Sequence, residues 1–494
     1  MGIKLVFIFL FVSISAVAGE DFVVSKSIVN AYNSCLNLKI DDAKIFLIED
    51  KSINKNNGFR FLIENYIDAI SLLIEDDPVF YKVALARKSK RLENLTTCNQ
   101  ESVFYNYVLS DIHLHWALIR LKFGDQIKAV NELRLAAKYN KLNEREFPTF
   151  MLNNKNSAII QAIASSIPPK FSWIGKQLSI EGTIESALSK IDELRVFTRI
   201  NKQYHFLNAE LNLINLFIQI NLSGISIEKI DLVKLTEEKE FNSLIVKFYL
   251  SVNLLKQGES EIAKRLIEEI SYQKNGIEFN YLNYLLAEIS MNTKLNDFNY
   301  IDIFLSKYKG SSYIKSALRK KAWLAILEGN IKQYNFLMNR ILKEGEEHTD
   351  DDKQAMLEAE SKVIPHPKLI SSRLYFDGGE YELSLQQLSL IDFKELSIEN
   401  KSEFFYRRGR CYQRLNLLKK AQSDFNNSIE IAKLSNPYIL AVSCFYQAQI
   451  YEYLENKNMA TKYYTMVLNS KQHSYKNSLD AKSKAALQRL NITN

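Results

Sequence analysis

Glycine and proline are scarce in this sequence, which contains 15 Gly and 7 Pro among 494 residues. This scarcity excludes collagen-like, linker-rich and low-complexity chains. It also argues against β-sandwiches and β-barrels, because such folds need a turn about every 8–12 residues. With 47% hydrophobic residues, the composition is that of an ordinary folded protein. The length corresponds to roughly three domains or to one elongated array.

An excess of charge of one sign is also missing. The chain has 64 basic and 57 acidic residues, and its net charge is +7. The basic residues do not cluster along the chain, so the surface is mixed rather than strongly basic. We therefore expect no nucleic-acid partner.

Familiar catalytic motifs are absent as well. The sequence contains no H-E-x-x-H, G-x-S-x-G, Walker A or G-x-G-x-x-G motif. His113 and His115 are two residues apart, so on a helix they point away from each other and cannot share a metal ion. A glycosidase-type carboxylate pair is defined by its spacing in space and stays open. We expect no catalytic residue, no cofactor and no metal, and predict that the protein is not an enzyme.

Only one long apolar run is present, and it lies at the start of the chain. The run LVFIFLFVSIS follows MGIK and precedes Ala16-Val17-Ala18. A basic start, an apolar run and an A-x-A site predict a secretory signal peptide over residues 1–18. The alternative is a membrane anchor, but the run is shorter than the ~20 residues that a span needs. We expect an exported mature chain with no integral membrane segment.

The four cysteines are Cys35, Cys98, Cys411 and Cys444. Export permits disulfides, and four cysteines allow three pairings. The alternative is that they are small buried residues, since a chain of this size needs no covalent cross-link. Cys411 lies two residues after Gly409, and Cys444 lies four residues before Ala448. Gly409 and Ala448 are equivalent positions of an internal repeat, so the two cysteines differ by six residues along the helix axis, or roughly 9 Å. We predict that these two thiols are not paired with each other.

The most informative feature is an internal repeat of small and bulky residues. From Gly409, an aromatic residue follows at offset three, alanine at offset twelve and another aromatic at offset sixteen. The same spacing starts at Ala448, while Ser251 and Ser372 follow it with a glycine at offset seven. The positions assigned to the repeat are Ser251, Ala263, Ser372, Gly379, Gly409, Tyr412, Ala421, Phe425, Ala448, Tyr451, Ala460 and Tyr464.

These offsets are those of two short antiparallel helices. Small residues are needed where the helix axes approach, and bulky residues fill the space beside them. Glycine at offset seven supplies the left-handed cap at which the chain reverses. The pattern resembles the tetratricopeptide repeat. It predicts an all-α fold, in which helical hairpins stack into a superhelix behind a less regular N-terminal helical part.

Three regions follow residues 1–18. Residues 19–200 are expected to form an N-terminal helical region with one tetratricopeptide-like hairpin and an irregular insert at Pro168-Pro169. Residues 201–360 read as degenerate helical repeats, and residues 361–494 as C-terminal tetratricopeptide-like repeats. In the insert, Trp173 is interpreted as a buried anchor beside the Pro-Pro turn, with a ligand platform as the alternative.

An acidic run, Asp350-Asp351-Asp352, follows Thr349 near the end of the degenerate repeats. Thr349 and the run have the composition of a helix N-terminus, where an oxygen cap and negative charge are favourable. The alternative is a calcium-binding loop, but the glycine and the terminal glutamate of an EF-hand are missing. We predict a helix that starts at Thr349.

Two stretches go beyond a generic repeat. SDIHLHWALIRLKFGD, with the FPTF to EGTIESAL segment after it, and DDDKQAMLEAES followed by HPKLISSRLYFDGGEY resemble a family of exported tetratricopeptide proteins of Bacteroidota. The family pattern is matched by Arg373, Leu374, Phe376, Asp377, Gly378, Gly379 and Tyr381. The first stretch is also more weakly similar to eukaryotic tetratricopeptide proteins of the mitochondrial outer membrane. The Bacteroidota resemblance implies a helical repeat fold in the periplasm, and it brings no catalytic residue.

Two functions remain open. In the first, the protein is a non-catalytic periplasmic scaffold whose concave surface binds a protein of the cell envelope, through which it could associate with the outer membrane. Arg407, Arg410 and Arg414, near Tyr406, form a basic stripe that is a candidate for this contact, although such stripes are also typical of solvated helix faces. In the second, aromatic residues of the groove capture a glycan or another nutrient.

Overall fold

The fold was described from a computed structural model, which describes residues 21–166, 182–223, 231–272, 276–293, 299–471, 473 and 475–492. The predicted signal peptide, the Pro168-Pro169 turn and Trp173 lie outside the described residues. Within those residues the structure consists of helices and loops and contains no strand, so the predicted all-α class is confirmed. None of the described helices has both the length and the apolarity to cross a bilayer.

The N-terminal helices pack around the largest hydrophobic core of the described chain. They are α1 (Lys26–Leu36), α2 (Ile40–Ile53), α3 (Gly58–Glu75), α4 (Pro78–Leu95), α5 (Val103–Lys122), α6 (Gln126–Glu146), α7 (Asn153–Ser165), α9 (Ile184–Ile200) and α10 (Asn208–Phe217). Many begin at a polar cap: Asn57, Asp77 and Ser102 each accept a hydrogen bond from an amide of the first turn. Such caps explain why these helices start where they do.

The middle of the chain continues as shorter helices. They are α11 (Leu232–Leu235), α12 (Leu244–Gln257), α13 (Ser260–Ser271), α14 (Tyr281–Asn292), α15 (Asn299–Lys307), α16 (Ile314–Leu327), α17 (Ile331–Ile341) and α18 (Asp350–Ser361). Helix α18 begins as predicted, because the side chain of Thr349 accepts a hydrogen bond from the amide of Asp352 at 3.0 Å. The acidic run is the first turn of this helix.

The C-terminal helices are the most regular part of the repeat. They are α19 (Pro367–Asp377), α20 (Tyr381–Ser389), α21 (Ile398–Arg414), α22 (Leu418–Ser435), α23 (Pro437–Tyr453), α24 (Lys457–Leu468) and α25 (Lys476–Ile492). Small residues lie between paired helices, as the spacing predicts: the hydroxyls of Ser372 and Ser384 are 2.8 Å apart between α19 and α20. A Cβ atom on Gly409 would lie only 2.9 Å from the ring of Phe425. The close approach of α21 and α22 therefore requires glycine.

A left-handed residue ends the first helix of several described hairpins. Glycine at offset seven has positive φ in the predicted hairpins, at 87° for both Gly258 and Gly379. Three further hairpins have a left-handed residue at the same offset without glycine, with φ between 57° and 59°. These residues are Leu38, Asn416 and Glu455. The packing of the two helices in these hairpins therefore imposes the left-handed conformation at offset seven, whether or not the residue there is glycine.

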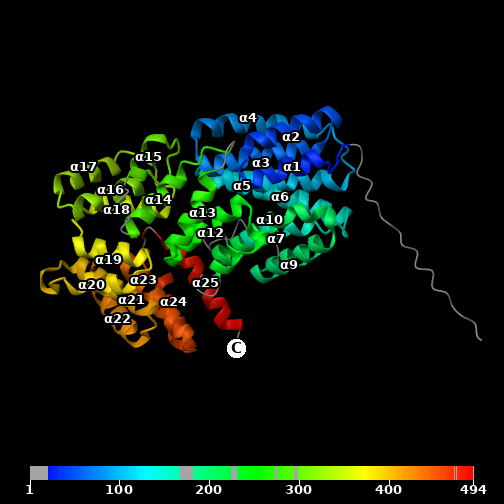
Figure 1. Cartoon of the computed structure of the whole chain (residues 1–494). Coiled ribbons are helices and arrows are strands. Elements are labelled where there is room, and N and C mark those ends of the chain that lie inside the picture. Colours follow the sequence, from blue (N-terminus) through cyan, green and yellow to red (C-terminus); the bar gives the residue numbers. More distant parts are fainter. Residues whose placement is uncertain are drawn as a thin grey trace, which may run out of the picture.

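The hairpins follow one another around a curve (Figure 1). In Figure 1 the blue N-terminal helices lie at the right and α15–α18 at the left, and the chain then returns so that α19–α25 lie below. The return brings α19 into contact with α12 and α14. At this closure, Arg414 donates a hydrogen bond to the carbonyl of Gln257 at 3.0 Å. The C-terminal repeats are therefore anchored on the middle of the chain and do not extend freely from it.

Candidate protein-binding surface

The predicted basic stripe of Arg407, Arg410 and Arg414 lies on α21, and its side chains contact residues of neighbouring helices. Arg407, Arg410 and Arg414 are all half-buried. The Arg407 Nε donates to Glu403 at 2.7 Å, and the Arg414 Nε donates to the hydroxyl of Tyr381 at 2.8 Å. The three arginines lie three and four residues apart on α21, and their guanidinium groups contact other side chains, so they do not form a fully solvated stripe.

Arg410 belongs to a longer series of stacked guanidinium groups and aromatic rings. Its guanidinium carbon lies 3.4 Å from the ring centroid of Tyr446 and 5.2 Å from that of Phe376. Three residues before Phe376 on the same helix, Arg373 lies 4.5 Å from the ring centroid of Trp323. We call Arg319, Trp323, Arg373, Phe376, Arg410 and Tyr446 the cation–aromatic band.

The band crosses four helices, α16, α19, α21 and α23, each of which is the first helix of a hairpin. First helices line one side of a stacked helical-repeat array, so residues from distant hairpins come together there. Arg319 and Trp323 are buried, so the accessible part of the band belongs to α19, α21 and α23. Phe376, Arg410 and Tyr446 are half-buried, as is Arg373. Each therefore keeps part of its surface accessible while its position is fixed by packing. Cation–π contacts of this kind stabilise by about 0.5–2 kcal/mol each.

Carboxylates and tyrosines lie next to the band. Glu358 accepts a hydrogen bond from the Trp323 indole at 2.8 Å, and Asp351 accepts one from the hydroxyl of Tyr475 at 2.6 Å. Burial alone would raise the pKa of the Asp351 carboxyl, but Arg319 and the Tyr475 hydroxyl bring that pKa below its usual value. The carboxylate is therefore charged and balances part of the positive charge of the band.

Tyr406, the aromatic residue predicted beside the stripe, is half-buried and lies 6.4 Å from Tyr446, centroid to centroid. Burial raises the pKa of its hydroxyl well above the ordinary value. Tyr438 and Tyr475 stack nearby at 5.1 Å. The tyrosines thus stay neutral and offer rings and hydroxyls beside the arginines.

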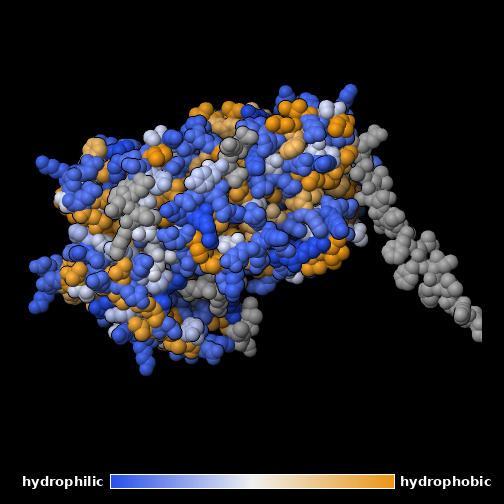
Figure 2. All heavy atoms as spheres, in the orientation of Figure 1, coloured by the Kyte–Doolittle hydropathy of each residue, from blue (hydrophilic) through white to orange (hydrophobic). Residues whose placement is uncertain are grey.

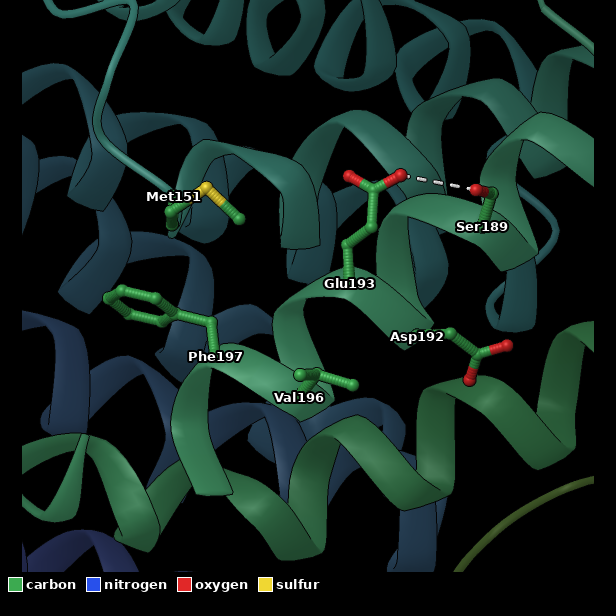
Figure 3. A pocket seen from close by; sticks show the side chains of 6 residues that line it. All are labelled: Met151, Ser189, Asp192, Glu193, Val196 and Phe197. Atoms are coloured by element: carbon green, nitrogen blue, oxygen red, sulfur yellow. Dashed lines mark hydrogen bonds between the residues drawn. The ribbon is translucent and has the colours of Figure 1, made fainter. Parts of the chain in front are cut away.

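Two hollows lie in the N-terminal and middle parts of the described chain. The first has a volume of about 550 Å³ and lies against α9, beside Met151 of the turn that precedes α7 (Figure 3). Met151 and Phe197 form its apolar wall, while Glu193 is hydrogen-bonded to Ser189 at 3.2 Å. Met151, Val196 and Phe197 make up half of the lining, so the hollow has the character of an apolar surface depression.

A buried polar cluster that the sequence did not predict lies inside the N-terminal helices. The Lys155 Nζ is 2.9 Å from Asp111 and 3.2 Å from Glu210. Tyr32 and Tyr66 donate to Glu210 at 2.5 and 2.6 Å. Burial lowers the pKa of Lys155, but the two carboxylates outweigh it and the pKa is raised well above its usual value. The side chain of the lysine is only 2% exposed, so the cluster is a buried ion-paired network inside the N-terminal helices.

The histidines of α5 point to opposite sides, as predicted. His113 is hydrogen-bonded to Glu132 at 2.7 Å, whereas His115 is hydrogen-bonded to Asn65 at 2.9 Å. In the described residues, no three His, Cys, Asp or Glu side chains are placed to hold a metal ion. All four cysteines are buried free thiols, and the Cys411 thiol contacts the Ser384 hydroxyl at 3.1 Å.

No protein-family model matches the sequence, and no curated protein matches it. Among solved structures, the chain is similar to the crystal structure of the APC/C hetero-tetramer Cut9-Hcn1, with 12% identity over 95% of this chain and 90% of that chain, and a TM-score of 0.25. It is also similar to a circular tandem repeat protein with novel repeat topology, with 11% identity over 94% of this chain and 98% of that chain, and a TM-score of 0.12. TM-scores this low carry no conclusion about function, and the Bacteroidota resemblance stays a prediction.

Proposed function

We propose that this protein is a non-catalytic scaffold that binds another protein through the cation–aromatic band. The observation that carries the proposal is the stacking of Arg373 on Trp323 and of Arg410 on Tyr446 across four hairpins. Trp323 is buried and holds Arg373 in place. Arginine and tyrosine are among the residues most enriched at binding hot spots. Their positions are fixed before a partner arrives, so binding costs little side-chain entropy.

The proposed setting is the periplasm, with a partner in the cell envelope. The support is the signal-peptide pattern of residues 1–18, together with the resemblance to exported tetratricopeptide proteins. N-terminal analysis of the protein recovered from its source cells tests this part separately. We expect the mature chain to begin at Gly19, and a chain that retains Met1 would contradict export through a cleaved signal peptide.

The binding surface can be tested with charge-reversal variants. The mature chain serves as bait in envelope extracts, and recovery of a stoichiometric protein complex is expected. Reversal of the α21 stripe with Arg407→Glu, Arg410→Glu and Arg414→Glu should abolish recovery of that partner. The matched control reverses three exposed lysines of α22, Lys419, Lys420 and Lys433, and should keep the partner.

Folding of the variants must be checked, because Arg414 also binds Gln257. A melting temperature and circular dichroism spectrum close to those of the unmodified chain show that the fold is intact. Where the triple reversal unfolds the protein, the milder variant Arg410→Ala replaces it, since Arg410 is the band residue with rings on two sides. Undiminished recovery of the same partner by a folded variant would remove the band as the binding surface.

A further inference from the structure

The second hollow is a crevice of about 700 Å³ between the hairpins α1–α2 and α12–α13. It lies apart from the cation–aromatic band, at the junction of the N-terminal helices with the middle repeats. A hydrogen bond from the amide of Leu244 to the Asn37 side chain, at 3.4 Å, ties the two walls together. The crevice is lined by Asn30, Asn33, Ser34, Asn37, Lys39, Asp42, Phe46, Asn242, Leu244, Lys247, Glu269 and Tyr272.

Side-chain amides dominate this crevice. Asn30 and Asn33 lie on α1 and Asn37 caps its C-terminus. The three are three and four residues apart, so they lie in a row on one side of the helix. Asn242 faces them from the opposite wall. Asn37 is held at both ends, since its Nδ2 donates to the carbonyl of Asn33 at 2.9 Å. Within the described part of the chain, the side-chain amides of Asn30, Asn33 and Asn242 make no hydrogen bond to another protein group. Asn33 and Asn242 are exposed and Asn30 is half-buried, so all three can be reached by a ligand.

Asn30 and Asn33 lower the intrinsic stability of helix α1. Asparagine is a poor helix former because its side chain competes for backbone hydrogen bonds, and each costs up to about 0.7 kcal/mol relative to alanine. Neither Asn30 nor Asn33 recovers this cost through a side-chain hydrogen bond in the described structure. Asn33 is exposed and Asn30 is half-buried, so water satisfies these amides in the free protein, and the hydroxyls of a bound ligand would take the place of that water.

The charges of the crevice balance. Lys247 and Glu269 form an ion pair at 2.5 Å, and Lys39 and Asp42 supply one further charge of each sign. A site without net charge does not favour a phosphate, a nucleotide or a strongly acidic peptide. The ligand expected here is neutral and able both to donate and to accept hydrogen bonds, because each amide offers two donors and one acceptor oxygen.

Two aromatic rings border the amides. Tyr272 is 80% exposed at the rim, and Phe46 is half-buried in the wall. Leu244 is the buried aliphatic residue of the lining. A peptide partner would require a deep apolar pocket for an anchoring side chain, which this lining does not provide. Exposed rings beside amides suit a ligand that has one apolar and one hydroxylated face.

We propose that this crevice is a binding site for a neutral oligosaccharide, with the hydroxyls of the sugar paired to Asn30, Asn33 and Asn242. The rings of Tyr272 and Phe46 contact the apolar C–H face of the sugar. A volume of about 700 Å³ lies within the usual range of ligand pockets and holds a short glycan. The proposal does not depend on the protein-binding function of the band.

The test uses the mature full-length chain and an array of uncharged oligosaccharides of two to four hexose units, followed by calorimetric titration of those that bind. The combined variant Asn33→Ala and Asn242→Ala should weaken the association constant about tenfold, since it removes two amide partners. The matched control is Asn335→Ala, an exposed asparagine on α17 that is remote from the crevice, and it should leave affinity unchanged.

The titrations distinguish the proposed glycan site from the alternatives. Binding of a neutral glycan that falls in the crevice variant but not in Asn335→Ala or Arg410→Ala supports it, and the Arg410→Ala result separates this site from the band. The absence of binding to every neutral oligosaccharide of the array overturns it, as does glycan binding that the crevice variant leaves unchanged. Binding of a peptide library that depends on Asn33 and Asn242 would also overturn it, because the site would then belong to a protein partner.

Discussion

Gly258 and Gly379 end the first helices of two distant hairpins, and their backbones are in direct contact. A Cβ atom on Gly258 would lie 2.7 Å from the Cα of Gly379, and one on Gly379 would lie 2.7 Å from the carbonyl oxygen of Gly258. Both residues have φ of +87°. Each glycine is thus required twice, once to reverse its own hairpin and once to let the C-terminal repeats close against α12.

This contact predicts that Gly379→Ala destabilises the closure. The left-handed backbone and the clash with a carbonyl together should cost about 2–4 kcal/mol. Gly329→Ala is the matched control, because Gly329 has φ of +75° but would place its Cβ in open space. It should cost only about 1 kcal/mol. Urea unfolding measures both, and equal losses would show that the Gly258–Gly379 contact does not stabilise the fold.

The left-handed residue at offset seven predicts a stabilising substitution. Glu455 is exposed and has φ of 59°, a conformation that costs a residue with a side chain about 1–2 kcal/mol. Glu455→Gly should therefore raise the free energy of unfolding by about 0.5–1 kcal/mol after the added chain entropy of glycine is subtracted. Asn416→Gly, at the equivalent position, should have a smaller effect because asparagine tolerates this conformation. A lower melting temperature for Glu455→Gly would contradict the argument.

The buried cluster predicts a large loss on removal of its single cation. Lys155→Met leaves Asp111 and Glu210 buried without a countercharge and should cost about 3–5 kcal/mol. Asp111→Asn and Glu210→Gln, added to Lys155→Met, should recover part of that loss because they remove the two charges. The exposed ion pair of Lys44 with Asp41 is the control, and Lys44→Met should change stability by less than about 1 kcal/mol. Equal effects of Lys155→Met and Lys44→Met would show that the cluster does not hold these helices together.

His473, in the turn before α25, predicts a dependence of stability on pH. Burial, and then the charge of Lys476, lower the pKa of the imidazole to about 4, while Asp480 opposes the shift. The unfolded chain therefore binds a proton near pH 6.5 before the folded chain does. Stability is complete above that pH and is lost as the pH falls toward 4, by roughly 2–3 kcal/mol from this group. Urea unfolding at pH 7 and pH 4.5 should show a smaller loss for His473→Gln than for the unmodified chain, and equal losses would contradict this role.

Several features followed from residue spacing because they depend on neighbours in the chain. The cap at Thr349 needs only the amide of Asp352, three residues later. The packing of Gly409 against Phe425 needs only the two helices of one hairpin. Such local geometry is repeated wherever the same spacing recurs, so the sequence alone predicts it.

Other features could not be predicted from spacing. Leu38 and Glu455 adopt the left-handed turn without glycine, because the paired helices over-determine the reversal and outweigh the local preference. Lys155, Asp111 and Glu210 lie on three helices and show no shared motif. The stripe on α21 was visible as a basic series, but its contacts with Tyr446 and Tyr381 come from other hairpins.

The amino-acid sequence by itself determined the all-α class and the hairpin as the repeating unit, because small and bulky residues at fixed offsets specify how two adjacent helices pack. The tertiary structure decided how the hairpins curve. It brought Gly379 against Gly258, assembled the cation–aromatic band from four hairpins, and placed Asn242 opposite the asparagine row of α1. Each hairpin adds a small rotation, and these rotations sum over the whole array, so the contacts between distant hairpins depend on all the packing between them and on no single stretch of sequence.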